Sequence, residues 1–577
     1  MLIYGDLERR ERPAAIRRSF LELVDAAQRG RTGIERHATL VVAFLLASEF
    51  VQGIADAEAE QRGCDGRSPR QDAGSRLLLV LARAIDRSRG TRRLAPLIPA
   101  IEDLLPELDW QEPVRLRRAE GYAFYALYPE SYLAAARRSG LGPETRVVGI
   151  RSIGTGLSAL VAAALGAAPP VTVRPIGHPF QRRLEVAPEL TIEMAERPDL
   201  PCAVVDEGPG LSGSSFAAVA DWLERCGTRR KDIHFFPSHE GEPGSRASDE
   251  IRKRWREAPR HVVGFDTLFL MPQRREDSIA GWVTGLIGPL DCQLQDISGG
   301  GWRRLARVDE TSWLPADGRF ERRKFLAVSD GCKWLVKFAG LGEDGARKLR
   351  VAQSLAEAGL GPEVAGLRYG FIVQRWVDGE APSKVDDRTC LVAEMARYLA
   401  FRASRFETSL PGASLERLAQ MASHNIECAI GPTAAARYAP LLRDGLRLES
   451  KIRRIDSDNR LHAWEWVRRP GGQLIKADAL DHSAGHDLIG AQDVAWDIAG
   501  AAVEHDLSRN ETAELCLRVS EGCGRPVDPD LLAVFKVCYL AFQLGLWTTS
   551  AEAAVGAEQA RLLDFSRRYR EALECMT

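Results

Sequence analysis

The sequence predicts an α/β and α+β multidomain protein with a helical N-terminal region, a parallel-sheet α/β domain and a mixed C-terminal domain. Three observations support this prediction. Apolar residues recur at three- and four-residue spacing through residues 1–120, which is typical of amphipathic helices. Apolar runs of strand length then alternate with helical segments to about residue 275, which favours a parallel sheet covered by helices. From about residue 319, two apolar runs flank a Ser-Asp-Gly-Cys turn, which predicts a hairpin.

Composition limits the classes of function. The 577 residues allow about three or four domains. The formal net charge of -2 does not indicate the basic surface that is typical of nucleic-acid-binding domains. Eleven cysteines without a Cys-x-x-Cys pair indicate reduced thiols in a cytoplasm and no zinc site. The most apolar run, residues 40–46, is far shorter than the ~20 residues of a membrane span, so it predicts a buried helix.

Residues 201–227 carry the strongest local signal for a ligand site. A short apolar run predicts a buried strand, and Asp206 and Glu207 follow it directly. A loop of small residues then leads into a helix over residues 217–226. Free backbone N–H groups and the positive end of a helix bind phosphate, and glycine lets the backbone approach the anion closely. The alternative interpretation is an ordinary strand–helix turn with a serine cap.

A second loop of the same type comes about fifty residues earlier. Residues 147–150 predict a strand, and the glycine-rich residues 151–156 then open a helix of small apolar residues. One such loop is common without function, but two in tandem favour a phosphate-binding enzyme. The basic segment between the two loops is either a flap that closes over the ligand or a solvated connection. His239 and Glu240, after the next predicted strand, are candidates for contact with an acceptor.

Residues 121–275 resemble type I phosphoribosyltransferases, which share the order of apolar strand, two acids and Ser/Thr-Gly phosphate loop. The resemblance implies that Asp206 and Glu207 are the catalytic acids that hold the ribose hydroxyls of phosphoribosyl diphosphate (PRPP). The acidic loop is one residue longer than the usual pattern, so either the loop bulges at residues 208–210 or Glu207 takes the place of the first acid. The implied PRPP-binding residues are Ser212, Gly213, Ser214 and Ser215 at the 5-phosphate, and Arg151, Ser152, Gly154, Thr155 and Gly156 at the pyrophosphate.

Residues 320–550 resemble the aminoglycoside phosphotransferase and protein-kinase-like families. The resemblance rests on WLVKFAG, a helix over residues 345–358 and the strand FIVQRWV, and it implies a bilobal fold. Lys337 would contact the phosphates of ATP, and Gln374 and Trp376 would lie in the adenine hinge. The helix carboxylate that pairs with the lysine would be Glu343 or Glu357.

The C-terminal lobe matches that family at LIKADALDH and IGAQDVAWDIAGA. The match implies that Asp478 binds Mg²⁺ and that Asp493 and Asp497 support the lobe. The family's catalytic His-Gly-Asp is not clearly present in RRIDSDNRLHAWEW. Asp456 and Asp458 are both candidates for the base, and we choose Asp458.

These observations divide the chain into a helical cap (1–120), a phosphoribosyltransferase-like domain (121–275), a junction (276–318) and a kinase-like domain (319–577). The predicted protein is a cytoplasmic PRPP-dependent phosphoribosyltransferase fused to an ATP-binding kinase-like module that acts on a nucleoside- or base-like metabolite. Its predicted ligands are PRPP, ATP and Mg²⁺. Nucleic acid and membranes are not predicted partners, and the helical cap could support a homodimer. The alternative is a nucleotide- or PRPP-sensing regulator with degenerate sites.

Overall fold

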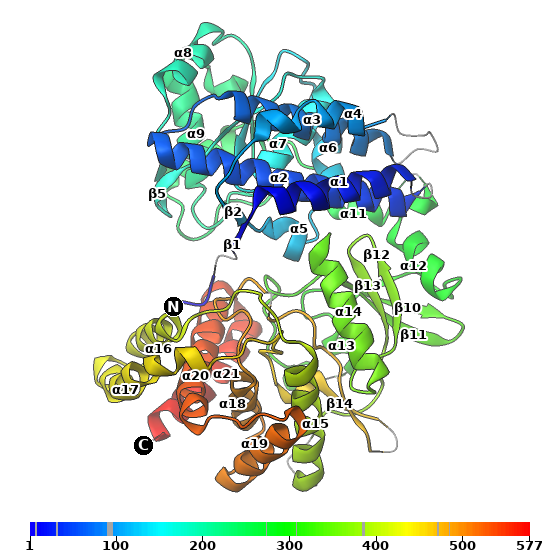
Figure 1. Ribbon diagram of the computed structural model, residues 1–577, viewed down its shortest axis with the longest axis vertical. Helices are drawn as coiled ribbons and strands as arrows, with labels where there is room; N and C mark the ends of the chain where they lie inside the picture. The colour runs from blue at the N-terminus through cyan, green and yellow to red at the C-terminus, as the bar shows by residue number, and fades with distance from the viewer. Residues whose placement is uncertain are drawn as a thin grey trace.

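The computed structural model describes residues 1–5, 8–29, 33–88, 96–272, 274–306, 309–382, 387–469, 472–483 and 485–576. Figure 1 shows the N-terminal helices and a parallel sheet in the upper part, and an antiparallel sheet with the C-terminal helices in the lower part. The chain passes from the upper to the lower part through helix α12 (Ile279–Ile287).

The helical N-terminal region is confirmed, and it packs on the parallel-sheet domain. Helix α2 (Ile34–Arg62) lies at its centre and contacts α1 (Pro13–Arg29), α3 (Pro69–Ser88) and α7 (Gly154–Leu165). Because neighbours surround it, α2 is apolar around most of its circumference. By length and composition α2 could cross a membrane, as could α20 (Pro529–Ala553), but 67% and 78% of their apolar windows are buried inside the protein. We therefore interpret both as core helices.

An antiparallel ribbon and a short helix complete this region. Strand β1 (Glu8–Glu11) pairs with β2 (Val114–Arg117), and α4 (Ile98–Glu102) precedes β2 in the chain. The pairing joins the two ends of the helical region. Sequence patterning did not predict this ribbon, because its strands are short and rich in charge.

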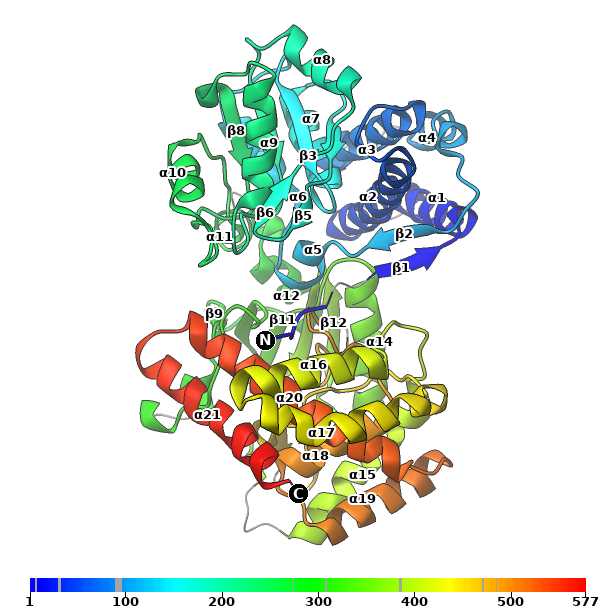
Figure 2. The same cartoon turned by 90° about the vertical axis from the view of Figure 1, so that its left-hand side faces the viewer.

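The parallel sheet is confirmed, with strand order β4–β3–β7–β8. Val148 of β3 pairs with Val171 on one side and with Val204 on the other, so β3 and β7 are neighbours. The loops that follow β3 and β7 therefore leave the same edge of the sheet, beside each other (Figure 2). The four strands are β3 (Arg146–Ile150), β4 (Val171–Val173), β7 (Cys202–Val205) and β8 (Ile233–Phe236).

The other elements of this domain surround the sheet, and α7 and α9 (Ser214–Arg225) pack against its strands. The apolar pattern of residues 262–265 predicts a further strand, but no strand forms there: residues 262–264 lie outside regular secondary structure, and helix α11 (Phe265–Phe269) begins at residue 265. A small hairpin, β5 (Ile176–His178) and β6 (Gln181–Arg183), forms from the basic segment between the two loops. The remaining helices are α5 (Glu120–Phe124), α6 (Pro129–Arg138), α8 (Pro188–Glu196) and α10 (Asp249–Glu257).

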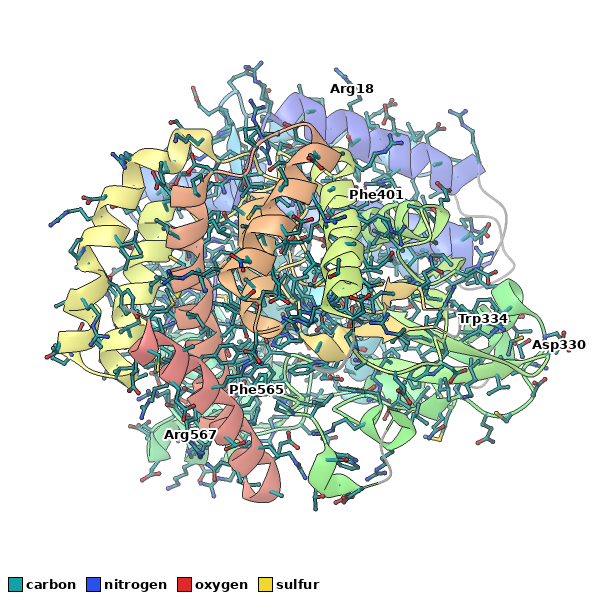
Figure 3. All side chains as sticks on the ribbon, turned by 90° about the horizontal axis from the view of Figure 1, so that it is seen from below. Arg18, Asp330, Trp334, Phe401, Phe565 and Arg567 are labelled. Carbon is teal, nitrogen blue, oxygen red and sulfur yellow. The ribbon has the colours of Figure 1, made fainter. Side chains whose placement is uncertain are left out.

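A five-stranded antiparallel sheet with order β12–β13–β11–β10–β9 begins the second half. The predicted hairpin is confirmed as β10 (Lys324–Ser329) and β11 (Cys332–Phe338). Asp330 and Gly331 both have positive φ, as a two-residue hairpin turn requires, and Asp330 lies at the margin of the molecule (Figure 3). The predicted helix is α14 (Glu343–Glu357), and β12 (Val364–Arg368) and β13 (Phe371–Arg375) follow it.

Strand β9 (Gln295–Asp296) pairs with β10, so part of the predicted junction belongs to this sheet. The sheet therefore begins before residue 319, where we expected the domain to start. Short helix α13 (Arg303–Ala306) lies between β9 and β10 in the chain.

The C-terminal lobe is helical, with one small hairpin beside the sheet. Helix α18 (Val494–Glu504) packs on α20, and α20 packs along α16 (Leu415–Ala429) and α21 (Gly556–Cys575) (Figure 2). Strands β14 (Trp466–Arg468) and β15 (Leu474–Lys476) form the hairpin. The other helices are α15 (Arg388–Arg405), α17 (Pro432–Gly445) and α19 (Arg509–Cys523).

The two halves share buried contacts. The ring of Tyr128, which precedes α6, lies 4.6 Å from that of Phe269 and 4.9 Å from that of Tyr369 in the β12–β13 turn. One hydrophobic cluster runs from Ile16 in α1 to residues of β11 and β13. The N-terminal Ile3 instead packs among the C-terminal helices, and the Leu2 amide donates to Asn425 at 2.7 Å. These contacts join the two halves into one body.

Candidate functional site

A cavity of about 630 Å³ lies between the five-stranded sheet and the C-terminal lobe. Its lining includes four of the residues that the sequence predicted for an ATP site: Lys337, Gln374, Trp376 and Asp478. Tyr125, which directly follows α5 of the upper domain, also lines it. The fold therefore brings the predicted nucleotide residues to one concave site, as a ligand site requires.

Lys337 lies on β11 and is almost fully buried at the cavity wall. Its ammonium is 2.7 Å from both carboxylate oxygens of Asp478 and also pairs with Asp481. Burial opposes the charge, but the two carboxylates outweigh burial and raise the pKa of Lys337. Lys337 outweighs the effect of burial on Asp478 and lowers the pKa of that carboxyl. Both groups are therefore charged at neutral pH.

The expected carboxylate partner on the helix is wrong. Glu343 and Glu357 are both exposed on α14, and neither pairs with Lys337. The helix instead presents Lys348, which is buried and donates to Asp481 at 2.7 Å. Asp481 thus lies between two lysines and takes the position of the anionic partner. Burial lowers the pKa of Lys348 to about 8 despite the neighbouring Asp481.

Glu465 is a second carboxylate in the cavity, and its place there was not predicted from the sequence. It precedes β14, lines the cavity and accepts a hydrogen bond from Lys476 at 2.7 Å. Burial raises the pKa of Glu465 to about 7, and the nearby charge of Asp478 adds to the rise. Two close carboxylates at the lysine end fit Mg²⁺, which binds through one or two carboxylates plus phosphate oxygens. The only sequence signal for Glu465 was its position between two tryptophans, in WEW.

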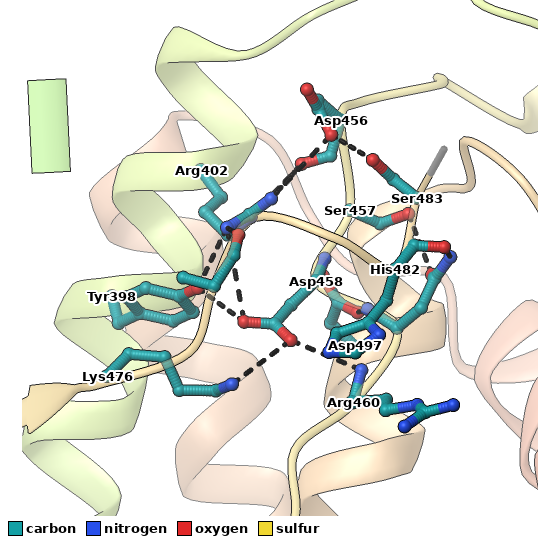
Figure 4. A network of polar contacts seen from close by, with 12 residues as sticks. Tyr398, Arg402, Asp456, Ser457, Asp458, Arg460, Lys476, His482, Ser483 and Asp497 are labelled. Atoms are coloured by element: carbon teal, nitrogen blue, oxygen red, sulfur yellow. Dashed lines mark hydrogen bonds and ion pairs between the residues drawn. The ribbon is translucent and has the colours of Figure 1, made fainter. Parts of the chain in front are cut away.

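Asp458 lies outside the cavity lining and has a buried network of its own (Figure 4). Tyr398 donates to one carboxylate oxygen, and Lys476 lies 3.3 Å from the other. Because both oxygens are occupied and the side chain is buried, the geometry gives no support to Asp458 as the base. Asp456, the other candidate, is also buried and binds Arg347 and Ser483.

The two aspartates expected to support the lobe do so. Asp497 accepts the backbone N–H groups of Asp458 and Asn459, both at 2.8 Å, and so fixes this loop. Asp493 caps α18 by accepting from Ala495 at 3.0 Å. These contacts explain the spacing of the two acids in IGAQDVAWDIAGA.

The raised pKa of Glu465 predicts that metal affinity depends on pH. Below about pH 7 this carboxyl holds a proton, which competes with the cation, so Mg²⁺ or Mn²⁺ should bind more tightly as the pH rises from 6 to 8. Metal titrations of the ATP-bound protein measure this change. Glu465→Gln should flatten the profile, whereas Glu380→Gln, an exposed acid on the same cavity, should leave it unchanged.

The acidic pair of the upper domain lies at the carboxyl edge of β7. Glu207 accepts the backbone N–H of Gly121 in α5 at 3.1 Å, and Asp206 accepts the N–H of Glu207 at 2.8 Å. Burial raises the pKa of Asp206 to about 7 and that of Glu207 to about 8. The nearby charge of Asp206 adds to the rise at Glu207. Among the residues that the structure describes, neither of these half-buried carboxyls forms an ion pair, so a ligand could satisfy both.

The serine loop beside the acids is closed in this structure. The hydroxyls of Ser212 and Ser214 both donate to the carbonyl of Pro179, at 3.2 and 3.0 Å. Pro179 lies in the turn of the β5–β6 hairpin, so the hairpin covers the loop. Helix α9 begins at Ser214 after Gly213, a cap without a side-chain hydrogen bond. Ser215 is half-buried in the first turn of α9, where the Ser214 backbone N–H donates to the Ser212 hydroxyl at 3.3 Å.

The first glycine-rich loop is largely structural, contrary to expectation. Arg151 is buried and pairs with Asp56 and Asp65 of the helical region, so its guanidinium cannot reach a ligand here. A Cβ on Gly154 would lie 2.6 Å from the Val205 carbonyl, and one on Gly156 would lie 2.6 Å from Ser48. Thr155 is buried as well. Ser152 alone of the predicted residues stays partly exposed, 3.4 Å from Arg174.

No protein-family model matches the chain, and no curated protein matches it. Among solved structures, the choline kinase LicA from Streptococcus pneumoniae is 19% identical over 44% of this chain and 89% of its own, with a TM-score of 0.31. The macrolide 2'-phosphotransferase MphH from Brachybacterium faecium is 15% identical over 53% and 98%, with a TM-score of 0.34. A spectinomycin phosphotransferase, APH(9)-Ia, is 12% identical over 51% and 93%, with a TM-score of 0.33.

All three proteins are phosphotransferases or kinases of small molecules by name, and each match covers about half of this chain. The resemblance of residues 121–275 to phosphoribosyltransferases receives no support from these structures.

Proposed function

We propose that the second half of the chain is an ATP-dependent phosphotransferase that acts on a hydroxyl of a small molecule. The observation that carries this proposal is the Lys337–Asp478 pair at the wall of a cavity of about 630 Å³. Lysine is a point charge suited to nucleotide phosphates, and a neighbouring aspartate can hold the metal that bridges them. Gln374 in β13 and Trp376 just after this strand line the same cavity, where the adenine would bind.

Each residue has a definite task in this proposal. Asp478 and Glu465 would hold Mg²⁺, which supplies charge neutralisation at the transferred phosphoryl group. Lys337 exchanges Asp478 for phosphate oxygens, while Asp481 keeps the ammonium in position and is itself held by Lys348. The P–O bond to ADP breaks as a P–O bond to the acceptor oxygen forms. Asp487 lines the cavity, burial raises its pKa to about 6, and it accepts the hydroxyl proton.

Turnover tests the proposal directly. The full chain with ATP and Mg²⁺ is expected to release ADP when a panel of hydroxyl-bearing metabolites is added, and Lys348→Met should reduce this rate by at least about tenfold, because Asp481 loses its second cation. Lys333→Met is the matched control, since Lys333 is an exposed lysine on β11 that pairs with Asp378 rather than with Asp481. Full activity of Lys348→Met would contradict the role given to Asp481.

A second candidate function belongs to the upper domain. Asp206 and Glu207, whose pKa values burial raises, precede the N-terminal end of α9 and favour a PRPP site in which the acids bind the ribose hydroxyls. The β5–β6 hairpin must move for the 5-phosphate to reach Ser212 and Ser214, because the Pro179 carbonyl occupies both hydroxyls. Pyrophosphate release from PRPP in the presence of candidate bases tests this function. PRPP binding without turnover would instead favour the regulatory alternative.

Location and assembly stay predictions. We propose a cytoplasmic protein with small-molecule partners, and sedimentation of the full chain tests whether it forms a homodimer.

A further inference from the structure

The guanidinium of Arg460 lies in the cavity wall. Across the described ranges, its side chain has neither a hydrogen bond nor an ion pair. Its backbone N–H donates to Asp458 at 3.2 Å, while its side chain points away from the Asp458 network (Figure 4). The loop that Asp497 fixes therefore positions this cation at the cavity.

Two histidines line the same part of the cavity, and each leaves a buried ring nitrogen unsatisfied. In the part of the chain that the structure describes, Nδ1 of His462 and Nε2 of His482 have no hydrogen-bond partner. The nearest carboxylate oxygen to His482 Nε2 belongs to Glu465, at 4.0 Å. Burial lowers the pKa of both rings, and the charge of Arg460 lowers each pKa further; all three side chains line the cavity. Buried polar atoms normally have hydrogen-bond partners. These three groups therefore indicate that a bound ligand supplies the missing partners.

The acids at this cavity are mostly satisfied by other cations. Asp317 pairs with Arg319, Glu321 with Lys324, and Glu465 with Lys476. Asp487 is the exception near Arg460 and bonds the backbone N–H of Ile489 at 3.1 Å. The unpaired arginine beside neutral histidines thus favours an anionic group on the ligand over a cationic one.

The rest of this wall is aromatic. Trp464 stacks on His462 with ring centroids 4.3 Å apart, and Trp547 and Phe320 also line the cavity. Such surfaces accommodate a planar ring or the apolar face of a sugar. Tyr125 connects the cavity to the upper site, because it follows α5, whose Gly121 bonds Glu207.

We infer that Arg460, His462 and His482 form an acceptor subsite for a phosphate monoester, as carried by a sugar phosphate or a nucleoside monophosphate. Arg460 and His482 donate to the phosphate oxygens, and His462 Nδ1 bonds a hydroxyl of the same molecule. This inference rests on the proposed phosphotransferase function and specifies its substrate class. The acceptor would then match the product class of a phosphoribosyl transfer, which is a ribosylated base with a 5-phosphate.

Calorimetry on the full chain with paired ligands tests the inference. With AMP-PNP and Mg²⁺ saturating, uridine monophosphate should bind at least about tenfold more tightly than uridine, and ribose 5-phosphate more tightly than ribose. Arg460→Gln should abolish both differences, and Asp487→Asn should increase them. Arg375→Gln is the matched control, because Arg375 lines the hinge end of the cavity, stacked on Trp334.

Three outcomes overturn the inference: equal binding within each pair, tighter binding of choline than of the phosphates, or weaker AMP-PNP binding in Arg460→Gln. Absence of AMP-PNP binding to the wild-type chain would instead contradict the phosphotransferase proposal. In that case the comparison of ribose 5-phosphate with ribose is repeated without nucleotide. It still decides whether Arg460 binds the anion.

Discussion

Asp478→Asn is expected to lower phosphoryl transfer by at least about 100-fold and to remove most of the Mg²⁺ dependence of ATP binding. Asparagine keeps the shape of the side chain but loses the charge that holds the metal. Lys337 stays compensated in this variant because it also pairs with Asp481. The fold should therefore survive, and near-UV circular dichroism checks this. Rates of ADP release and ATP affinity with and without Mg²⁺ measure the effect.

Asp378→Asn is the matched control, since Asp378 lines the same cavity but is exposed and pairs with the exposed Lys333. It should behave as wild type. Lys337→Met should also weaken ATP binding, and its effect combined with Asp478→Asn should be less than additive, because both groups act on one phosphate tail. Additive losses would mean that the two residues serve different ligands.

The double variant Asp206→Asn, Glu207→Gln is expected to lose PRPP binding by at least about 100-fold and to gain stability above neutral pH. Both carboxyls have pKa values raised in the folded state, to about 7 and about 8. The folded protein therefore holds protons that the unfolded chain releases, and wild-type stability falls as the pH rises from about 4 to 8. The neutral amides avoid this loss. Thermal unfolding at pH 4 and pH 8 should show a gain of several degrees at pH 8 alone.

A second double variant separates this effect from general surface charge. Glu196→Gln, Asp199→Asn removes two exposed acids that precede β7, whereas Asp206 and Glu207 follow it. It should change neither PRPP binding nor the pH dependence of unfolding. Unaltered PRPP affinity in the Asp206/Glu207 variant would remove the ribose role from both acids.

Local pattern predicted the elements that bear the sites. The apolar run before Asp206 and the turn at Asp330–Gly331 are short-range signals, and both elements form as expected. Lys337 and Asp478 could be found because Lys337 lies within a recognisable strand and Asp478 closely follows one. The two residues are 141 positions apart in the chain, and the fold brings them together.

Long-range partners could not be predicted from the same signals. Arg151 looked like a ligand residue beside glycines, but Asp56 and Asp65, 95 and 86 residues away, bind its guanidinium. Lys348 replaced the expected helix acid because the carboxylate comes from Asp481 in another lobe. The covering of Ser212 and Ser214 by Pro179 likewise depends on a hairpin that returns over the sheet edge. The spacing of residues along the sequence does not indicate such long-range partners.

Calorimetric titration of the full-length chain with ATP, with and without Mg²⁺, tests the central claim most directly. A site built from Lys337, Asp478 and Glu465 should bind ATP–Mg²⁺ with a dissociation constant below about 1 mM, and removal of Mg²⁺ should weaken binding at least about tenfold. Absence of binding at millimolar ATP, or equal binding without the metal, would contradict the claim that this cavity is a phosphotransferase site.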